Sequence, residues 1–186
     1  DLDLEPMYVF NCGMTCQVRC PSFLSDDYVR ELIEDVKNAI EYATGSVSTK
    51  WGSLRAAMGH PAPFKLTYVE IGNENWGPEY NERYEKFYSE LKALYPHLKF
   101  ISNTHTERDG LPTEIVDEHF YNAPEFFAEN MDRYNSYPRS GPEIFVGEFA
   151  VTSGGYNARL RAAVAEALFM VGLEKNQDIV KLASYA

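Results

Sequence analysis

Two glutamates each come directly after a short apolar run, and this placement is the first sign of chemistry in the chain. Glu74 follows the run at residues 66–71, and Glu148 ends the run at residues 143–148. A carboxylate beside a buried strand needs a partner or a shifted pKa, which makes it costly in a plain core. Each also has an ordinary explanation, Glu74 as an acid in the first turn of a helix and Glu148 as a solvated carboxylate. We expect both to be catalytic.

A pair of carboxyl groups suits the hydrolysis of a glycosidic bond. One group must be protonated to assist departure of the leaving group, and the other must be ionised to attack the anomeric carbon or to activate water. In a retaining enzyme the two groups lie about 5–5.5 Å apart. The chemistry predicted for Glu74 and Glu148 is therefore acid/base or acid/nucleophile catalysis.

Four further side chains lie near these acids in the sequence and are predicted to bind substrate. Asn73 and Trp76 flank Glu74, and His119 and Tyr121 end a later apolar segment. In parallel α/β folds, functional groups gather at the carboxyl ends of the strands. The alternatives are a turn or cap for Asn73, an ordinary strand histidine for His119, and core packing for the two aromatic residues.

Apolar runs predict six strands, and most are separated by helical or helix-like stretches. The predicted strands are Met7–Phe10, residues 66–71, Lys99–Ser102, and residues 115–121, 143–148 and 178–185. This alternation predicts a parallel sheet with helical crossovers, in the α/β class. An open doubly wound sheet also fits, but no glycine-rich phosphate loop follows a strand, which disfavours a nucleotide-binding fold.

Start and stop signals locate the helices between these strands. They predict helices from Ser25 to a stop at Gly45, from Pro78 to a point before Pro96, from Pro124 through Met131 and Tyr134, and over the run that begins at Leu160. Residues 46–63 contain glycine, proline and serine without a clear period, and are predicted to form a long loop.

The composition indicates a globular domain with a neutral partner. The chain has 186 residues, of which 45% are hydrophobic, so it can bury a sizeable core. Its formal net charge of −11 disfavours a nucleic-acid backbone or an anionic membrane as partner. No stretch is apolar enough to span a membrane, and residues 1–6 lack the features of a signal peptide.

The three cysteines are expected to be free of metal. Cys12, Cys16 and Cys20 have a spacing that fits neither a zinc site nor a thioredoxin motif, and an odd count leaves at least one thiol unpaired within the chain. No histidine pair with chelating spacing occurs either. We therefore expect no metal ion.

Several longer segments carry more specific patterns than a single Asn-Glu pair. They are Trp51-Gly52-Ser53-Leu54-Arg55-Ala56 with Gly59-His60-Pro61, Tyr68-Val69-Glu70-Ile71-Gly72-Asn73-Glu74-Asn75, Asp117-Glu118-His119-Phe120-Tyr121, Ile144-Phe145-Val146-Gly147-Glu148-Phe149-Ala150, and residues 178–186. Together, over nearly the whole chain, they resemble family 51 of the glycoside hydrolases, the α-L-arabinofuranosidases.

This resemblance implies a (β/α)8 barrel and a role for each site residue. Glu74 resembles the general acid/base after the fourth barrel strand, and Glu148 resembles the nucleophile after the seventh. Asn73 matches the asparagine that binds the sugar 2-hydroxyl. His119 and Tyr121 match the pair near the nucleophile, with Tyr121 orienting it by a hydrogen bond. The resemblance implies no metal and no organic cofactor.

The resemblance also implies that residues 1–186 are an incomplete (β/α)8 catalytic domain. The six strands would be strands three to eight, with the first two strands and the C-terminal β-sandwich of the family absent. A sheet that lacks two strands has unpaired edges and an opened core, so this chain by itself is expected to be inactive or poorly folded.

The function implied is release of terminal α-L-arabinofuranosyl residues from arabinan or arabinoxylan by a retaining double displacement. The alternatives are another barrel glycosidase, such as a β-xylosidase or endoglucanase, and a carbohydrate-binding protein without catalysis. The expected partner is an arabinose-containing oligo- or polysaccharide. An extracellular or periplasmic location is favoured, and homo-oligomer formation by the full-length protein is left open.

Overall fold

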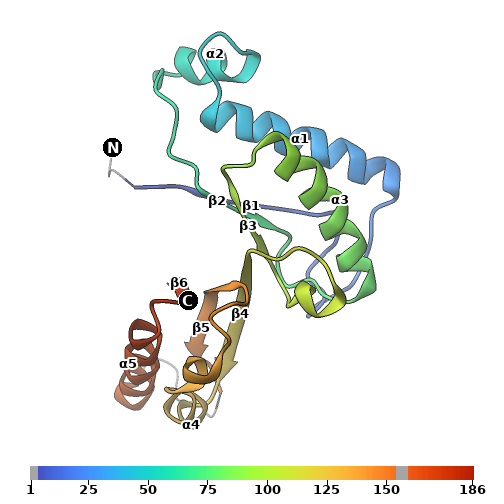
Figure 1. Ribbon diagram of the computed structural model, residues 1–186. Coiled ribbons are helices and arrows are strands. Elements are labelled where there is room, and N and C mark those ends of the chain that lie inside the picture. The colour runs from blue at the N-terminus through green and yellow to red at the C-terminus, as the bar shows by residue number, and fades with distance from the viewer. Residues whose placement is uncertain (1–3, 154–158) are drawn as a thin grey trace. The chain divides into compact units, whose positions relative to one another are not determined.

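The computed structural model describes residues 4–153 and 159–186, and the chain divides into two compact units. The first unit is Asp1–Thr113 and the second is Glu114–Ala186 (Figure 1). Each unit contains a three-stranded parallel sheet with its helices, as the alternation predicted. Residues 1–3, where the stretch examined for a signal peptide begins, lie outside the described residues.

The sheet of the first unit has the strand order β1-β2-β3, and helices connect its strands. The strands are β1 (Met7–Phe10), β2 (Tyr68–Ile71) and β3 (Lys99–Ser102), and the long helices are α1 (Asp26–Thr44) and α3 (Pro78–Leu94). One face of α1 is buried at Val29, Ile33, Val36 and Ile40, which is the helical spacing seen in the sequence. The core of this unit lies between that face, α3 and the sheet.

The ends of these two helices follow their local signals. Asp26 and Asp27 lie in the first turn of α1, where acids favour the positive end of the helix dipole. The backbone N–H of Gly45 donates to the Glu41 carbonyl at 2.7 Å and ends the helix. Pro78 opens α3, a position in which its missing N–H costs no hydrogen bond.

The prediction of a long loop at residues 46–63 is wrong, because Lys50–Ala57 form a helix, α2. Its first turn is capped by Thr49, whose Oγ1 accepts from the Gly52 N–H at 3.2 Å. Its anchor is Arg55, a fully buried cation rather than an apolar stripe. The helix therefore lacks the apolar period on which sequence reasoning depends.

The guanidinium of Arg55 binds backbone carbonyls from both flanks of α2. It donates to Tyr42 at 2.7 Å, Gly45 at 2.8 Å, and His60 and Pro61 at 3.0 Å each. These bonds join the end of α1 to the segment that leads into β2. They also satisfy carbonyl groups that would otherwise be buried without a donor.

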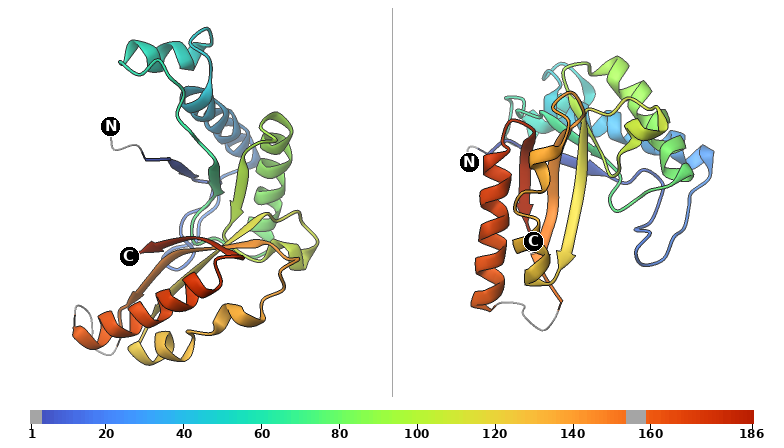
Figure 2. Two further views of the ribbon diagram at one scale, coloured as in Figure 1. Left: turned by 60° about the vertical axis from the view of Figure 1, so that its left-hand side comes forward. Right: turned by 60° about the horizontal axis from the view of Figure 1, so that its bottom comes forward.

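The second unit is built in the same way around the strand order β4-β5-β6. Its strands are β4 (Ile115–Asn122), β5 (Glu143–Val151) and β6 (Val180–Tyr185), and its helices are α4 (Pro124–Glu129) and α5 (Leu160–Lys175). α5 runs alongside this sheet (Figure 2). Phe127, Phe149 and Phe169 pack edge to face in the core between them.

Several predicted boundaries in this unit are corrected by the structure. β4 and β5 run on to Asn122 and Val151, so His119, Tyr121 and Glu148 lie within strands rather than at their last residues. The two strands extend this far because residues 119–122 of β4 still pair with residues 148–151 of β5. β6 begins two residues later than predicted, at Val180, and β2 of the first unit likewise begins two residues late, at Tyr68.

The helix predicted from Pro124 through Tyr134 ends early, at Glu129. The Asn130 side chain donates to the Phe126 carbonyl at 2.8 Å and closes the last turn. Tyr134 instead lies in a short 3₁₀ helix, Arg133–Ser136, where its hydroxyl donates to Glu118 at 2.7 Å. A tertiary hydrogen bond thus overrides the helical spacing of Phe127, Met131 and Tyr134. Among the described residues, no helix is long and apolar enough to cross a membrane.

Replacement of Arg55 by alanine is expected to destabilise the intact protein by about 3 kcal/mol, because it leaves several buried carbonyls without donors. Urea denaturation measures the change in the free energy of unfolding. Leu54→Ala on the same helix is the matched control, since Leu54 is 43% exposed, and should change it by less than about 1 kcal/mol. Equal effects of the two substitutions would contradict the anchoring role.

Candidate functional site

In the first unit, the chain turns sharply where β2 ends, and this turn carries Asn73, Glu74 and Trp76. Gly72 has a φ of +83°, in the left-handed region, which favours glycine. A Cβ there would lie 2.7 Å from Asn75 Oδ1 and 2.9 Å from Cys12 Sγ. Both the backbone conformation and the close neighbours therefore require glycine directly before the predicted site.

Glu74 has a φ of +50°, an uncommon conformation for a residue with a side chain. Its carbonyl accepts from the Gln17 N–H at 3.2 Å, and its carboxylate Oε2 accepts from Cys16 Sγ at 2.7 Å. The side chain is half-buried. A strained backbone held by surrounding bonds is typical of functional positions, since neighbouring contacts must compensate for the strain.

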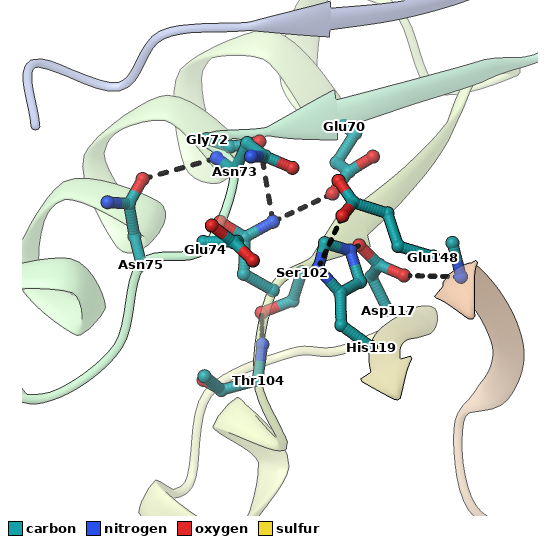
Figure 3. A network of polar contacts seen from close by, with 12 residues as sticks. Glu70, Gly72, Asn73, Glu74, Asn75, Ser102, Thr104, Asp117, His119 and Glu148 are labelled. Atoms are coloured by element: carbon teal, nitrogen blue, oxygen red, sulfur yellow. Dashed lines mark hydrogen bonds and ion pairs between the residues drawn. The ribbon is translucent and has the colours of Figure 1, made fainter. Parts of the chain in front are cut away.

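Asn75 organises this turn from within, although sequence reasoning assigned it no role. It is 1% exposed, and its Oδ1 accepts from the Asn73 N–H at 3.2 Å (Figure 3). Its Nδ2 donates to the Thr15 carbonyl at 2.9 Å. Asn73 and Trp76 are exposed on either side of it, Trp76 by 43%. Burying the middle amide thus leaves Asn73 and Trp76 at the surface.

A second layer of polar contacts lies under the turn. Glu70, on β2, is 2% exposed and accepts from Asn103 Nδ2 at 2.8 Å. The Tyr80 hydroxyl donates to the Ile71 carbonyl at 2.8 Å and accepts from the Asn103 N–H at 2.9 Å. Burial raises the pKa of the Tyr80 phenol well above its usual range, so it stays a neutral hydrogen-bond donor.

In the second unit, the structure brings Glu148, His119 and Tyr121 together. Glu148 lies on β5 directly opposite His119 on β4, and Tyr121 is two residues further on the same strand. The Tyr121 hydroxyl donates to Glu148 Oε2 at 2.6 Å, and His119 Nδ1 lies 3.6 Å from the same oxygen. Residues two apart on a strand share one face, which explains why both reach Glu148.

Asp117 completes this cluster, and sequence reasoning did not name it as a site residue. It is 6% exposed, its Oδ2 lies 2.6 Å from His119 Nε2, and its Oδ1 accepts from the Gly147 N–H at 2.8 Å (Figure 3). A carboxylate acceptor places the proton of His119 on Nε2, so Nδ1 is the atom that faces Glu148. The sequence did offer one signal for Asp117, since an acid there directly follows the apolar pair Ile115-Val116 of a predicted strand.

Gly147 has to be glycine because Asp117 occupies the space beside it. A Cβ at Gly147 would lie 2.2 Å from Asp117 Oδ1 and 2.8 Å from its Cγ. This close approach lets the Gly147 N–H of β5 donate to the Asp117 carboxylate of β4. His119 is therefore oriented by a carboxylate that is itself fixed to the strand carrying Glu148.

The opposite face of β4 holds a carboxylate with a structural part. Glu118 accepts from the hydroxyls of Tyr134 at 2.7 Å and Tyr137 at 2.9 Å. Burial, followed by the negative charge of Glu118, raises the pKa of Tyr137 to about 12, so it remains a donor. The two acids that precede His119 thus differ: Asp117 orients the histidine, and Glu118 ties the 3₁₀ segment to β4.

Chemically, the second cluster presents one carboxylate that accepts from a phenol and lies beside an imidazole, and the first presents one carboxylate that accepts from a thiol. Carboxylates and imidazoles also bind metal ions, but both nitrogens of His119 already face carboxylates of its own unit. In that arrangement Asp117 fixes the His119 ring beside Glu148, and the Tyr121 hydroxyl is the donor that orients the Glu148 carboxylate.

Comparison with known proteins assigns the family. Residues 1–139 match the family described as the alpha-L-arabinofuranosidase 1 domain. The chain is 39% identical over 198 residues to an extracellular exo-alpha-L-arabinofuranosidase of Streptomyces chartreusis, and 41% identical over 191 residues to alpha-L-arabinofuranosidase 2 of Arabidopsis thaliana. All of this chain is covered in both cases, but it spans only 23% and 28% of the length of those relatives.

A solved structure extends the similarity to the fold. The arabinose-bound MgGH51 α-L-arabinofuranosidase matches 89% of this chain and 29% of its own, with a TM-score of 0.81 and 33% sequence identity. The expected fold class is thereby confirmed. The chain belongs to the α-L-arabinofuranosidases of glycoside hydrolase family 51, and its six described strands with their helices are part of a (β/α)8 barrel.

Proposed function

We propose that the intact protein is a retaining exo-α-L-arabinofuranosidase, with Glu148 as nucleophile and Glu74 as general acid/base. Membership of the family is the observation that carries this proposal. Its substrates would be the terminal α-L-arabinofuranosyl units of arabinan or arabinoxylan. The names of the relatives support the sugar, and the extracellular exo-enzyme of Streptomyces chartreusis supports both release of terminal units and an extracellular location.

The contacts of Glu148 support its assignment as nucleophile. Tyr121 and His119 both approach Oε2, so we assign the attack on the anomeric carbon to Oε1. A phenol hydrogen bond of 2.6 Å restricts rotation of the carboxylate. Glu148 also lies on a paired strand, which holds its backbone rigidly. A rigid support suits a nucleophile, because its oxygen must approach the anomeric carbon along one direction.

The position of Glu74 supports its assignment as acid/base. It follows a parallel strand at the carboxyl end, where barrel enzymes carry their catalytic groups. Its side chain is half-buried, so it can be shielded from bulk water and still reach a substrate. The neighbouring Asn73 and Trp76 are exposed and would bind the sugar 2-hydroxyl and stack on a sugar ring, respectively.

The reaction would proceed in two displacements. Glu148 attacks the anomeric carbon while Glu74 donates its proton to the glycosidic oxygen, giving a covalent arabinosyl-enzyme and a free leaving group. Glu74, now ionised, removes a proton from water, which attacks the same carbon and releases arabinose with its original configuration. This mechanism requires the two carboxylates to lie about 5–5.5 Å apart.

The first product of an α-L-arabinofuranoside is expected to be the α-anomer, because two inversions give retention. Proton NMR of the reaction of the intact protein, recorded before mutarotation, measures this directly. Initial formation of the β-anomer would show a single displacement. Faster cleavage of aryl β-xylosides or glucosides than of the arabinofuranoside would favour another barrel glycosidase.

Replacement of Glu148 by alanine is expected to lower kcat on the order of ten-thousand-fold, because the covalent intermediate no longer forms. Added azide should restore turnover of an activated aryl arabinofuranoside and yield the β-azide. With Glu74→Ala, azide should instead yield the α-azide, since the covalent intermediate still forms. Glu129→Ala, at an exposed position ending α4, is the control. Undiminished turnover by Glu148→Ala would remove it as nucleophile.

Replacement of Gly147 by alanine is expected to lower kcat/KM about tenfold or more, because the added methyl displaces Asp117 and releases His119. It should also cost about 1–3 kcal/mol of stability from overpacking, measurable by urea denaturation. Gly141→Ala is the matched control, since its Cβ would lie 3.4 Å from the nearest atom. Wild-type activity in Gly147→Ala would contradict the positioning role of Asp117.

A further inference from the structure

The loop after β1 reaches across to the turn that carries Glu74 and is joined to it by backbone groups and by two amide side chains, those of Gln17 and Asn75. The Gln17 N–H donates to the Glu74 carbonyl at 3.2 Å, and Gln17 Oε1 accepts from the Trp76 N–H at 2.6 Å. Asn75 Nδ2 donates to the Thr15 carbonyl at 2.9 Å. These bonds set the register between the two segments without using the side chain of Cys16.

The Cys16 thiol makes a separate contact, with the functional group of Glu74 itself. Its Sγ donates to Glu74 Oε2 at 2.7 Å, and the side chain is partly buried. A donor at one carboxyl oxygen restricts rotation of the carboxyl group and leaves the other oxygen to face the substrate. The thiol is therefore the contact of this loop that acts on the carboxyl group rather than on the backbone.

The other two cysteines have different environments, which sets Cys16 apart. All three are free thiols. Cys12 is buried, its Sγ donates to Asn75 Oδ1 at 3.6 Å, and burial raises its pKa to about 11. Cys20 is exposed at the far end of the loop. Neither donates to Glu74 in the described contacts, so the three positions offer an internal comparison.

We propose that Cys16 is a positioning residue for the acid/base: its thiol holds the Glu74 carboxyl in the orientation that protonates the leaving group. This inference rests on the proposed function, since it assumes that Glu74 is the general acid. It predicts a specific defect on loss of the thiol. Proton donation should suffer, while attack by Glu148 and the register of the loop should not.

The test compares two substrates of the intact protein that differ in their need for acid catalysis. The dinitrophenolate group of a dinitrophenyl arabinofuranoside departs without being protonated, whereas the phenolate group of a phenyl arabinofuranoside needs a proton to depart. Cys16→Ala is expected to lower kcat/KM about tenfold for the phenyl substrate and less than about twofold for the dinitrophenyl substrate. Cys16→Ser retains a hydroxyl donor and should recover most of the loss.

Cys20→Ala is the matched control for removing a thiol from the same loop, and it should behave as wild type with both substrates. Thermal unfolding of each variant checks that the fold is intact. An equal loss on both substrates, or no loss, would overturn the positioning role of Cys16 while leaving the proposed function standing. A wild-type protein that cleaves neither substrate would overturn the proposed function, and this inference with it.

Discussion

A carboxylate that follows or interrupts an apolar strand has to be held by hydrogen-bond donors, and the rest of the site depends on how this is done. In the second unit the donor is the phenol of Tyr121 on β4, aimed at Glu148 on β5, with the His119 imidazole beside it. In the first unit a thiol from the loop after β1 reaches Glu74. A carboxylate without such donors would rotate freely or shift its pKa, and the geometry needed for displacement at carbon would be lost.

Glycine makes both arrangements possible, for different physical reasons. Gly72 supplies a backbone conformation that turns the chain immediately before Asn73 and Glu74. Gly147 supplies space, because Asp117 sits where a Cβ would be. In each case a missing side chain lets a polar group approach the backbone closely. A methyl group added at either glycine would displace the polar group that approaches it.

The family assignment and the local geometry answer different questions. Membership of the α-L-arabinofuranosidases accounts for the barrel strands. Features such as the thiol beside Glu74 and the carbonyl-bound Arg55 come from the contacts of this chain. Since the chain spans about a quarter of the length of its curated relatives, the activity is proposed for the intact protein.

The sequence by itself determined the alternation of strands and helices, the ends of α1 and α3, and the candidate acids. These follow from local physics: apolar spacing, capping residues, and the cost of a carboxylate next to a buried strand. Tertiary structure decided the rest. α2 depends on carbonyls brought to Arg55 by other segments, and the helix after Pro124 ends early because Tyr134 binds Glu118. The hydrogen bonds of Asp117 with Gly147 and of Cys16 with Glu74 join residues 30 and 58 positions apart, a separation that no local pattern reports.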